Sequence, residues 1–183
     1  MDHLNEKTIQ STSIYKGRII DLQIDEVELP NGKTSKREIV KHPGAVAIIP
    51  ITKEGNIILV RQFRKALEKT IIEIPAGKLD EGEAPLMCAK RELAEETGYQ
   101  SSELEFLLSF YTSPGFADEI IHLYVASGLS EGTTNRDEDE FLDVMEVTLE
   151  EAEAMVGDQQ IHDAKTAYAI QYLRMKEWTK NQD

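Results

Sequence analysis

Cysteine is almost absent from this sequence of 183 residues, because Cys88 is its only one. A single thiol excludes an internal disulfide and leaves too few thiolates for a structural zinc site. We expect Cys88 to be a small buried residue of a helix, as free cysteine usually is. Long apolar runs are lacking too, since the longest, at residues 45–51, falls far short of a membrane span.

Targeting signals are also missing at the N-terminus. The first ten residues, MDHLNEKTIQ, have neither the basic flank nor the apolar stretch of a signal peptide. The composition, 40% hydrophobic and 30% charged, is typical of a globular domain with a sizeable core. The sequence therefore predicts a cytoplasmic protein with no membrane partner.

Positive charge is scarce. The chain has 20 Lys and Arg against 34 Asp and Glu, which gives a formal net charge of −14. This balance argues against nucleic acid as a partner, because such binding needs clustered Lys and Arg against the phosphates. If the ligand is itself an anion, a metal cation must mediate its binding.

The first forty residues show strand patterns. Residues 19–29 alternate apolar and polar side chains, and Asn31-Gly32 is typical of a tight hairpin turn into a second strand at 34–40. An ordered-looking strand precedes this hairpin. We therefore expect an N-terminal β region at residues 1–42 and a main domain at residues 43–183.

The main domain alternates predicted strands and helices, which indicates an α/β fold. Two apolar runs, 45–52 and 56–64, are separated by Lys53-Glu54-Gly55 and predict a strand pair. Further strands are predicted at 71–74, 104–111, 120–125 and 144–147, and two helices near Leu149 and Asp163. The side chains of Tyr168, Tyr172, Met175 and Trp178 lie near helical spacing, which predicts packing in the core or in a dimer.

A helix crowded with carboxylates is predicted at residues 84–97. Pro85 suits its first turn, and Gly98 suits a left-handed C-terminal cap. Leu86, Ala89, Leu93 and Thr97 share one side, which we expect to pack on a sheet. Glu92, Glu95 and Glu96 repel one another unless a cation lies between them, and hard divalent metals suit such oxygen ligands. A solvated acidic face is the alternative.

The spacing around these glutamates decides between the two interpretations. Gly77, five residues, Glu83, seven residues and then RELAEETGY match the Nudix signature at every specified position. From average residue usage, a chance match at one position is on the order of one in a billion. The chain therefore resembles the Nudix hydrolases, a family with an α/β/α sandwich, a mixed sheet and divalent-metal chemistry.

The resemblance implies roles for the residues of this motif. Glu92 and Glu96, with the carbonyl of Ala76, would be metal ligands. Glu95 would act as a further catalytic carboxylate, and Arg91 and Glu83 would orient the carboxylates. The implied cofactor is Mg²⁺ or Mn²⁺, with two or three ions bound.

Motifs outside the signature narrow the resemblance. The stretches REIVKHPGAVAIIP, RQFRK, EIPAG and SPGFADE stand in an order that is similar to the bacterial ADP-ribose pyrophosphatase subgroup. The implied reaction is hydrolysis of the diphosphate of ADP-ribose to AMP and ribose 5-phosphate. Other nucleoside diphosphate sugars remain alternative substrates, and a non-catalytic ligand-binding regulator of Nudix shape is a further alternative.

The same resemblance implies substrate contacts. Arg37 and Arg64 would hold the diphosphate or the ribose, and Glu119 would accept a hydrogen bond from the sugar or the base. Ser113 and Lys78 would line the pocket. His42 is either a phosphate-side residue or a turn residue, and Arg18 stands where some relatives have an aromatic under the adenine.

A base to activate water is expected in the acidic stretch 136–140. Alignment with the subgroup favours Glu138 as the base and Glu140 as a metal contact; an exposed acidic loop is the alternative. In similar enzymes the N-terminal β region exchanges between subunits, so we expect a homodimer whose N-terminal regions contribute to the partner's site.

Overall fold

The computed structural model describes residues 3–132 and 141–180. The chain divides into two compact units. The first contains the residues up to Gly44 together with Ser109–Ile121, and the second contains Ala45–Leu108 together with the described residues from His122 onward. None of the described helices combines the length and the apolar character needed to cross a bilayer.

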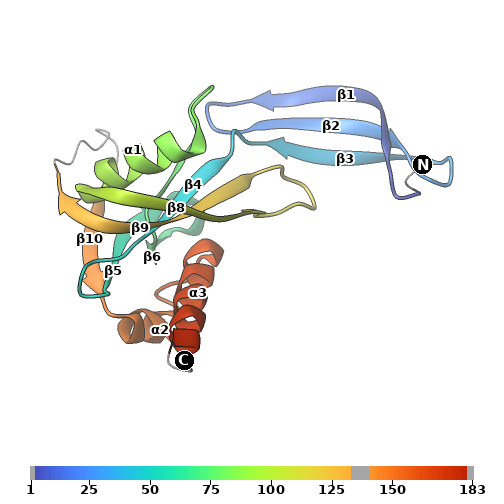
Figure 1. The fold of residues 1–183 in the computed structure, drawn as a ribbon. Coiled ribbons are helices and arrows are strands. Elements are labelled where there is room, and N and C mark those ends of the chain that lie inside the picture. Colours follow the sequence, from blue (N-terminus) through green and yellow to red (C-terminus); the bar gives the residue numbers. More distant parts are fainter. Residues whose placement is uncertain (1–2, 133–140, 181–183) are drawn as a thin grey trace. The chain divides into compact units, whose positions relative to one another are not determined.

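The first unit is built on a three-stranded antiparallel sheet. Its strands β1 (Lys7–Lys16), β2 (Asp21–Glu28) and β3 (Thr34–Lys41) follow one another in sequence and in space (Figure 1). The predicted hairpin is confirmed: β2 pairs with β3, and Gly32 has a φ of +78°, which favours glycine. The N–H of Val40 donates to the Phe116 carbonyl and the N–H of Asp118 donates to the Val40 carbonyl, and these hydrogen bonds join the loop at residues 112–119 to β3.

Two sheets form the centre of the second unit (Figure 1). One has the order β7-β4-β9-β8, made of Ala76–Lys78, Ala45–Pro50, Ile120–Glu131 and Tyr99–Tyr111. The other has the order β10-β5-β6, made of Leu142–Val147, Ile57–Arg64 and Lys69–Glu73. A short 3-10 helix, η1 (Lys65–Leu67), connects β5 to β6.

The predicted pairing of the two apolar runs after residue 45 is wrong. The runs form β4 and β5 as expected, but these strands belong to different sheets and share only an isolated bridge between Ile51 and Ile57. Residues 46–50 of β4 are buried without alternation, which is typical of a strand covered on both faces. The connection is a tight turn, closed by this bridge and by a hydrogen bond from the Thr52 N–H to the Asn56 carbonyl, and it carries the chain from one sheet to the other.

The carboxylate helix forms as predicted. Helix α1 (Pro85–Thr97) begins with Pro85 in its first turn, and Gly98 caps it with a φ of +76°. It packs on β4 and β7, and its buried Cys88, Ala89 and Leu93 join Val46 and Ile48 in one core cluster. Leu86 departs from the prediction, because it is 41% exposed in the first turn.

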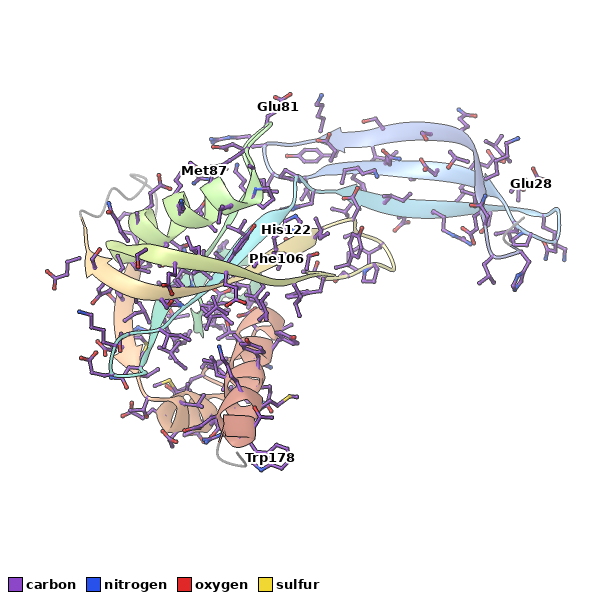
Figure 2. The ribbon with its side chains drawn as sticks, viewed as in Figure 1. Glu28, Glu81, Met87, Phe106, His122 and Trp178 are labelled. Atoms are coloured by element: carbon purple, nitrogen blue, oxygen red, sulfur yellow. The ribbon has the colours of Figure 1, made fainter. Side chains whose placement is uncertain are left out.

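Helices α2 (Leu149–Gly157) and α3 (Ala164–Lys180) lie on the opposite side of the sheets from α1 (Figure 1). Ile170 and Leu173 of α3 are buried, but Met175 is 68% and Trp178 is 63% exposed. Figure 2 shows Trp178 at the C-terminal end of this helix. The predicted stripe of aromatics and methionine is therefore not part of the core of the single chain, and packing in a dimer stays a prediction.

Candidate active site

Arg91 is the hub of the carboxylate cluster on α1. Its Nε and Nη2 donate to the two carboxylate oxygens of Glu83, at 3.0 and 2.8 Å. Its Nη1 donates to Glu92 at 2.7 Å and to Glu95 at 3.0 Å. The hydrogen bonds from Arg91 hold the pKa of Glu83 at about 2, and those acids raise the pKa of Arg91 further above its ordinary value. One guanidinium thus organises three carboxylates.

Gly77 lets the backbone approach the carboxylate of Glu92. A Cβ added at Gly77 would lie 1.9 Å from the carboxyl carbon of Glu92 and 2.0 and 2.3 Å from its oxygens. Glu92 is only 8% exposed, so its carboxylate has little room to withdraw. Glycine at this position is therefore required for the observed packing of α1 against β7.

Glu96 contacts β7 at Ala76, the residue before Gly77. Its carboxylate accepts a hydrogen bond of 3.0 Å from the N–H of Ala76, and the side chain is 1% exposed. The backbone at 76–77 thus lies against two buried carboxylates that are one helical turn apart. Ala76, Glu92 and Glu96 thus lie close together, and their roles as metal ligands stay a prediction.

The donor set fits a divalent cation. Buried carboxylates are costly unless they are paired, and here Arg91 is shared among Glu83, Glu92 and Glu95. Carboxylate and backbone carbonyl oxygens are the ligands that Mg²⁺ and Mn²⁺ favour. The types of donor present are therefore those of the metal that the signature implies.

No three His, Cys, Asp or Glu side chains in the described part of the chain are grouped closely enough to hold a metal ion. Arg91 takes oxygens of Glu92 and Glu95 that a cation would otherwise use. Glu140, which is predicted to contact metal, and Glu138, the predicted base, lie outside the described residues.

Arg64 belongs to a second cluster in the same unit. Its Nε donates to the carboxylate of Glu73 at 2.6 Å, and its side chain is 38% exposed. Glu73 is 3% exposed and its other oxygen binds Lys165.

Lys78, on β7, is exposed, and its carbonyl accepts from the Cys88 thiol at 3.4 Å.

Cys88 is buried, as predicted. Its exposed fraction is 0%, and burial is the main reason why the pKa of its thiol rises to about 12. Arg91 Nη2 lies 3.3 Å from the sulfur. The thiol therefore packs beneath the carboxylate cluster in its neutral form.

The remaining predicted substrate residues fall in the first unit. Arg37 lies on β3, where Nε and Nη2 bind the carboxylate of Glu6 at 2.8 and 2.5 Å. Its Nη1 donates to the Ser35 hydroxyl at 2.9 Å and to the Lys36 carbonyl at 3.1 Å. All three guanidinium nitrogens of Arg37 are thus engaged inside this unit.

His42 and Glu119 come together within the first unit. His42 Nε2 lies 3.6 Å from Glu119, and the hydroxyl of Thr112 donates to the other Glu119 oxygen at 2.6 Å. The N–H of Gly44 donates to Nδ1 of His42 at 3.1 Å. Asp118 accepts from the His42 N–H at 2.8 Å and pairs with Lys41. His42 and Glu119 thus lie close together, and the choice between a phosphate-side residue and a turn residue stays a prediction.

Ser113 and Arg18 make fewer contacts than Arg37, His42 and Glu119 do. The carbonyl of Ser113 accepts from the N–H groups of Phe116 and Ala117, which closes the loop before β9. Arg18 lies exposed in the connection from β1 to β2. Neither position contradicts a substrate contact, and neither tests it.

Several residues of these clusters had no predicted role. Glu6, Glu73 and Lys165 each hold a charged group of a predicted site residue or its partner. The sequence does indicate a role for Glu73, because a charged residue inside the apolar run of β6 needs a buried counterion. It does not indicate one for Glu6 or Lys165, since no nearby residue marks an acid or a lysine as a long-range partner.

Comparison with known proteins agrees with the geometry. Residues 41–168 match the model of the NUDIX domain. The chain belongs to the Nudix family. Residues 6–40 match the model of the nucleoside diphosphate sugar hydrolase N-terminal domain, so both parts of this Nudix protein have known counterparts.

Individual relatives are similar over nearly the whole length. The ADP-ribose pyrophosphatase of Bacillus subtilis (strain 168) is 60% identical over 179 residues, which is 97% of each chain. The methanol dehydrogenase activator of Bacillus methanolicus is 59% identical over 178 residues, which is 96% of each chain. The crystal structure of an ADP compounds hydrolase matches with a TM-score of 0.82 at 25% identity, over 97% of this chain and 95% of that one. The predicted α/β Nudix fold is confirmed.

Proposed function

We propose that this Nudix protein hydrolyses the diphosphate of ADP-ribose, giving AMP and ribose 5-phosphate, with Mg²⁺ as the cofactor. The observation that carries the proposal is the packing of buried Glu92 and Glu96 against the backbone of residues 76–77. The 60% identity to a relative named ADP-ribose pyrophosphatase supports the choice of substrate. One water adds across the phosphoric anhydride, so each product keeps one phosphate.

The residues of α1 would hold the cation. Glu92, Glu96 and the carbonyl of Ala76 would be ligands, and Glu95 would supply a further carboxylate. When bound, the cation neutralises the diphosphate and favours ionisation of a water. Arg91 keeps the carboxylates in their rotamers, because each of its nitrogens donates to an acid of the cluster.

The other predicted residues complete the proposal. Glu138 would be the base and Glu140 a metal contact. Arg37 and Arg64 would bind phosphate oxygens through fork-like donors. Glu119, held by Thr112 and His42, would accept from the sugar or the base. Ser113 and Lys78 would line the pocket, and the guanidinium of Arg18 would stack on the adenine.

The test is release of AMP from ADP-ribose by the purified protein, with and without Mg²⁺. Glu96→Gln should lower kcat by several orders of magnitude, because it removes an anionic ligand without changing shape. Glu103→Gln, on the exposed part of β8, is the control and should leave turnover unchanged. Full turnover by Glu96→Gln at saturating Mg²⁺ would remove this residue from the proposed site. A panel of ADP-sugars and GDP-sugars, compared by kcat/KM, separates the alternative substrates.

We also propose the homodimer, with residues 1–42 exchanged between subunits. Every residue of β1 is exposed in the single chain, including Ile9, Ile14 and Tyr15 at 54%, 52% and 58%. Apolar side chains on an uncovered strand favour burial against another surface. Light scattering should give a mass near twice 20.7 kDa, and a fully active monomer would contradict the proposal. The cytoplasmic location stays a prediction.

A second candidate function rests on the 59% identity to a relative named methanol dehydrogenase activator. In this role the chain would raise the rate of a methanol dehydrogenase. The assay adds wild type or Glu96→Gln protein to such an enzyme and follows its initial rate. Activation by wild type alone would link this role to the hydrolytic site; no activation by either would remove the candidate.

A further inference from the structure

A cluster of four charged groups, two of them buried, joins β5, β6 and the start of α3 within the second unit. Glu73 is 3% and Lys165 is 9% exposed. One oxygen of Glu73 accepts from Lys165 Nζ at 2.5 Å, and the other accepts from Arg64 Nε at 2.6 Å. Lys165 also pairs with Asp163 at 3.1 Å. Two cations and two anions thus form a chain that ends at Arg64.

Stability alone does not explain this arrangement. Replacing a buried ion pair by apolar side chains of similar volume is often neutral or stabilising, because desolvation offsets the attraction. The cluster nevertheless lies beside the apolar core residues Ile71, Ile72 and Ile74 of the same segment. We infer that the charges act on a ligand, which can contact the cluster only at its exposed member.

Arg64 is that point. Glu73 engages Nε alone, and within the described residues neither Nη of Arg64 makes a hydrogen bond. The guanidinium is anchored through Nε, and the side chain is 38% exposed, so solvent and a ligand can reach it. Arg37 differs, because all three of its nitrogens are engaged by Glu6, Ser35 and Lys36. Of these two predicted phosphate-binding arginines, Arg64 is the one already arranged to donate.

We propose that Glu73 and Lys165 are positioning residues that hold Arg64 with both Nη groups directed at a diphosphate oxygen. This inference rests on the proposed function, which gives Arg64 its ligand. Glu73 fixes the guanidinium through Nε. Lys165 occupies the second Glu73 oxygen, so the carboxylate cannot turn to bind Arg64 through Nε and Nη together. Pre-arranged donors bind a ligand more tightly because less freedom is lost on binding.

The base of the cluster is fixed by the first turn of α3. Asp163 accepts from the N–H groups of Lys165 and Thr166, at 3.1 and 3.2 Å, which caps the helix. The hydroxyl of Thr166 donates to Asp163 and accepts from the N–H of Ile74 at 2.9 Å. Lys165 is therefore held by its own helix end, and the same helix end fixes the residue that follows Glu73.

The first experiment is a double-mutant cycle on ADP-ribose hydrolysis. Lys165→Met should raise KM about tenfold, from the loss of one charge-assisted contact, and change kcat less than about twofold. In an Arg64→Ala background the same change should move KM less than about twofold. An equal rise in both backgrounds would show that Lys165 acts on the fold and would overturn the proposal. Lys165→Arg keeps the charge and should restore KM.

A paired neutral variant covers the case in which Lys165→Met does not fold. Glu73→Gln with Lys165→Met removes the two buried charges together, and Asp163 keeps its hydrogen bonds to the N–H groups of residues 165 and 166. We expect a melting temperature close to wild type and a KM raised about tenfold, because Arg64 loses the carboxylate that holds it. A wild-type KM in this folded variant would overturn the proposal.

Binding of inorganic diphosphate separates this inference from the choice of substrate. Calorimetry with Mg²⁺ present should show binding to wild type that Arg64→Ala and the paired variant both weaken about tenfold. If wild type binds diphosphate in this way and leaves ADP-ribose intact, the proposed function fails and the positioning stands. If diphosphate binding does not depend on Arg64, or the paired variant binds as wild type does, the positioning fails.

Discussion

Gly77→Ala is the sharpest perturbation that the site offers. The added methyl would lie 1.9 Å from the carboxyl carbon of Glu92, so this carbon must move by about 1.5 Å to reach ordinary contact near 3.4 Å. Gly77 has no positive φ, so the backbone itself accepts alanine. The strain therefore falls on the carboxylate, which is buried and bound to Arg91 at 2.7 Å.

The expected loss follows from that displacement. A misplacement of about 1 Å at a catalytic group costs on the order of 100-fold in rate, so kcat for ADP-ribose should fall at least about 100-fold. Loss of one charge-assisted hydrogen bond costs about 1.5–3 kcal/mol of folding free energy, so the protein should remain folded at room temperature. Activity is thus predicted to suffer far more than stability.

AMP release at saturating Mg²⁺ and urea unfolding measure the two effects. Gly157→Ala is the matched control, because nothing lies within 4 Å of its added Cβ and the residue ends α2. It should keep full activity and gain up to about 1 kcal/mol of stability from helix propensity. If Gly77→Ala retains activity within threefold of wild type, the position of the Glu92 carboxylate is not what the reaction depends on.

Three other predictions concern titration, reactivity and competition for an arginine. The pKa of Glu83 is lowered to about 2 by Arg91, so wild type should exceed Glu83→Gln in stability by roughly 1–3 kcal/mol above pH 4.5. Urea titrations should show this advantage vanish as the pH falls toward 2. An advantage that persists at pH 2 would contradict the pairing of Glu83 with Arg91. Cys88, with its pKa near 12, should resist a thiol reagent in the native protein and react once urea unfolds the chain; labelling at the native rate of a free thiol would show that α1 is not packed as described. Glu6→Gln should release Arg37 and lower KM for ADP-ribose about two- to threefold, as expected for an exposed ion pair, whereas a raised KM would make Glu6 an aid to binding.

The sequence was most informative where structure depends on near neighbours. Pro85 and Gly98 marked the ends of α1, because a first-turn proline and a left-handed cap are decided within a few residues. Asn31 and Gly32 marked the hairpin between β2 and β3 for the same reason. The family signature also lies within one loop and one helix, so Ala76, Glu92 and Glu96 were found together.

The failures share a different cause. The spacing of β4 and β5 suggested a hairpin, yet which sheet each strand joins depends on β9, β10 and the burial of both faces. The contact between Lys165 and Glu73 spans 92 positions, and that between Arg37 and Glu6 spans 31. Such pairs are decided by the assembled fold, and no pattern within a short window contains them.

Arginine shows most clearly what the structure adds to the motif. Arg91 spends four of its five N–H groups on carboxylates and the fifth on the Lys78 carbonyl and the Cys88 sulfur, so it organises the cluster and has no donor left for a substrate. Arg37 is paired with the Glu6 carboxylate, so a phosphate that binds the Arg37 guanidinium must displace this carboxylate. Arg64 differs from both, because it binds the buried Glu73 through Nε alone. In a chain of net charge −14, selectivity for a diphosphate therefore depends less on how many arginines surround the site than on which of their donors the neighbouring acids leave open.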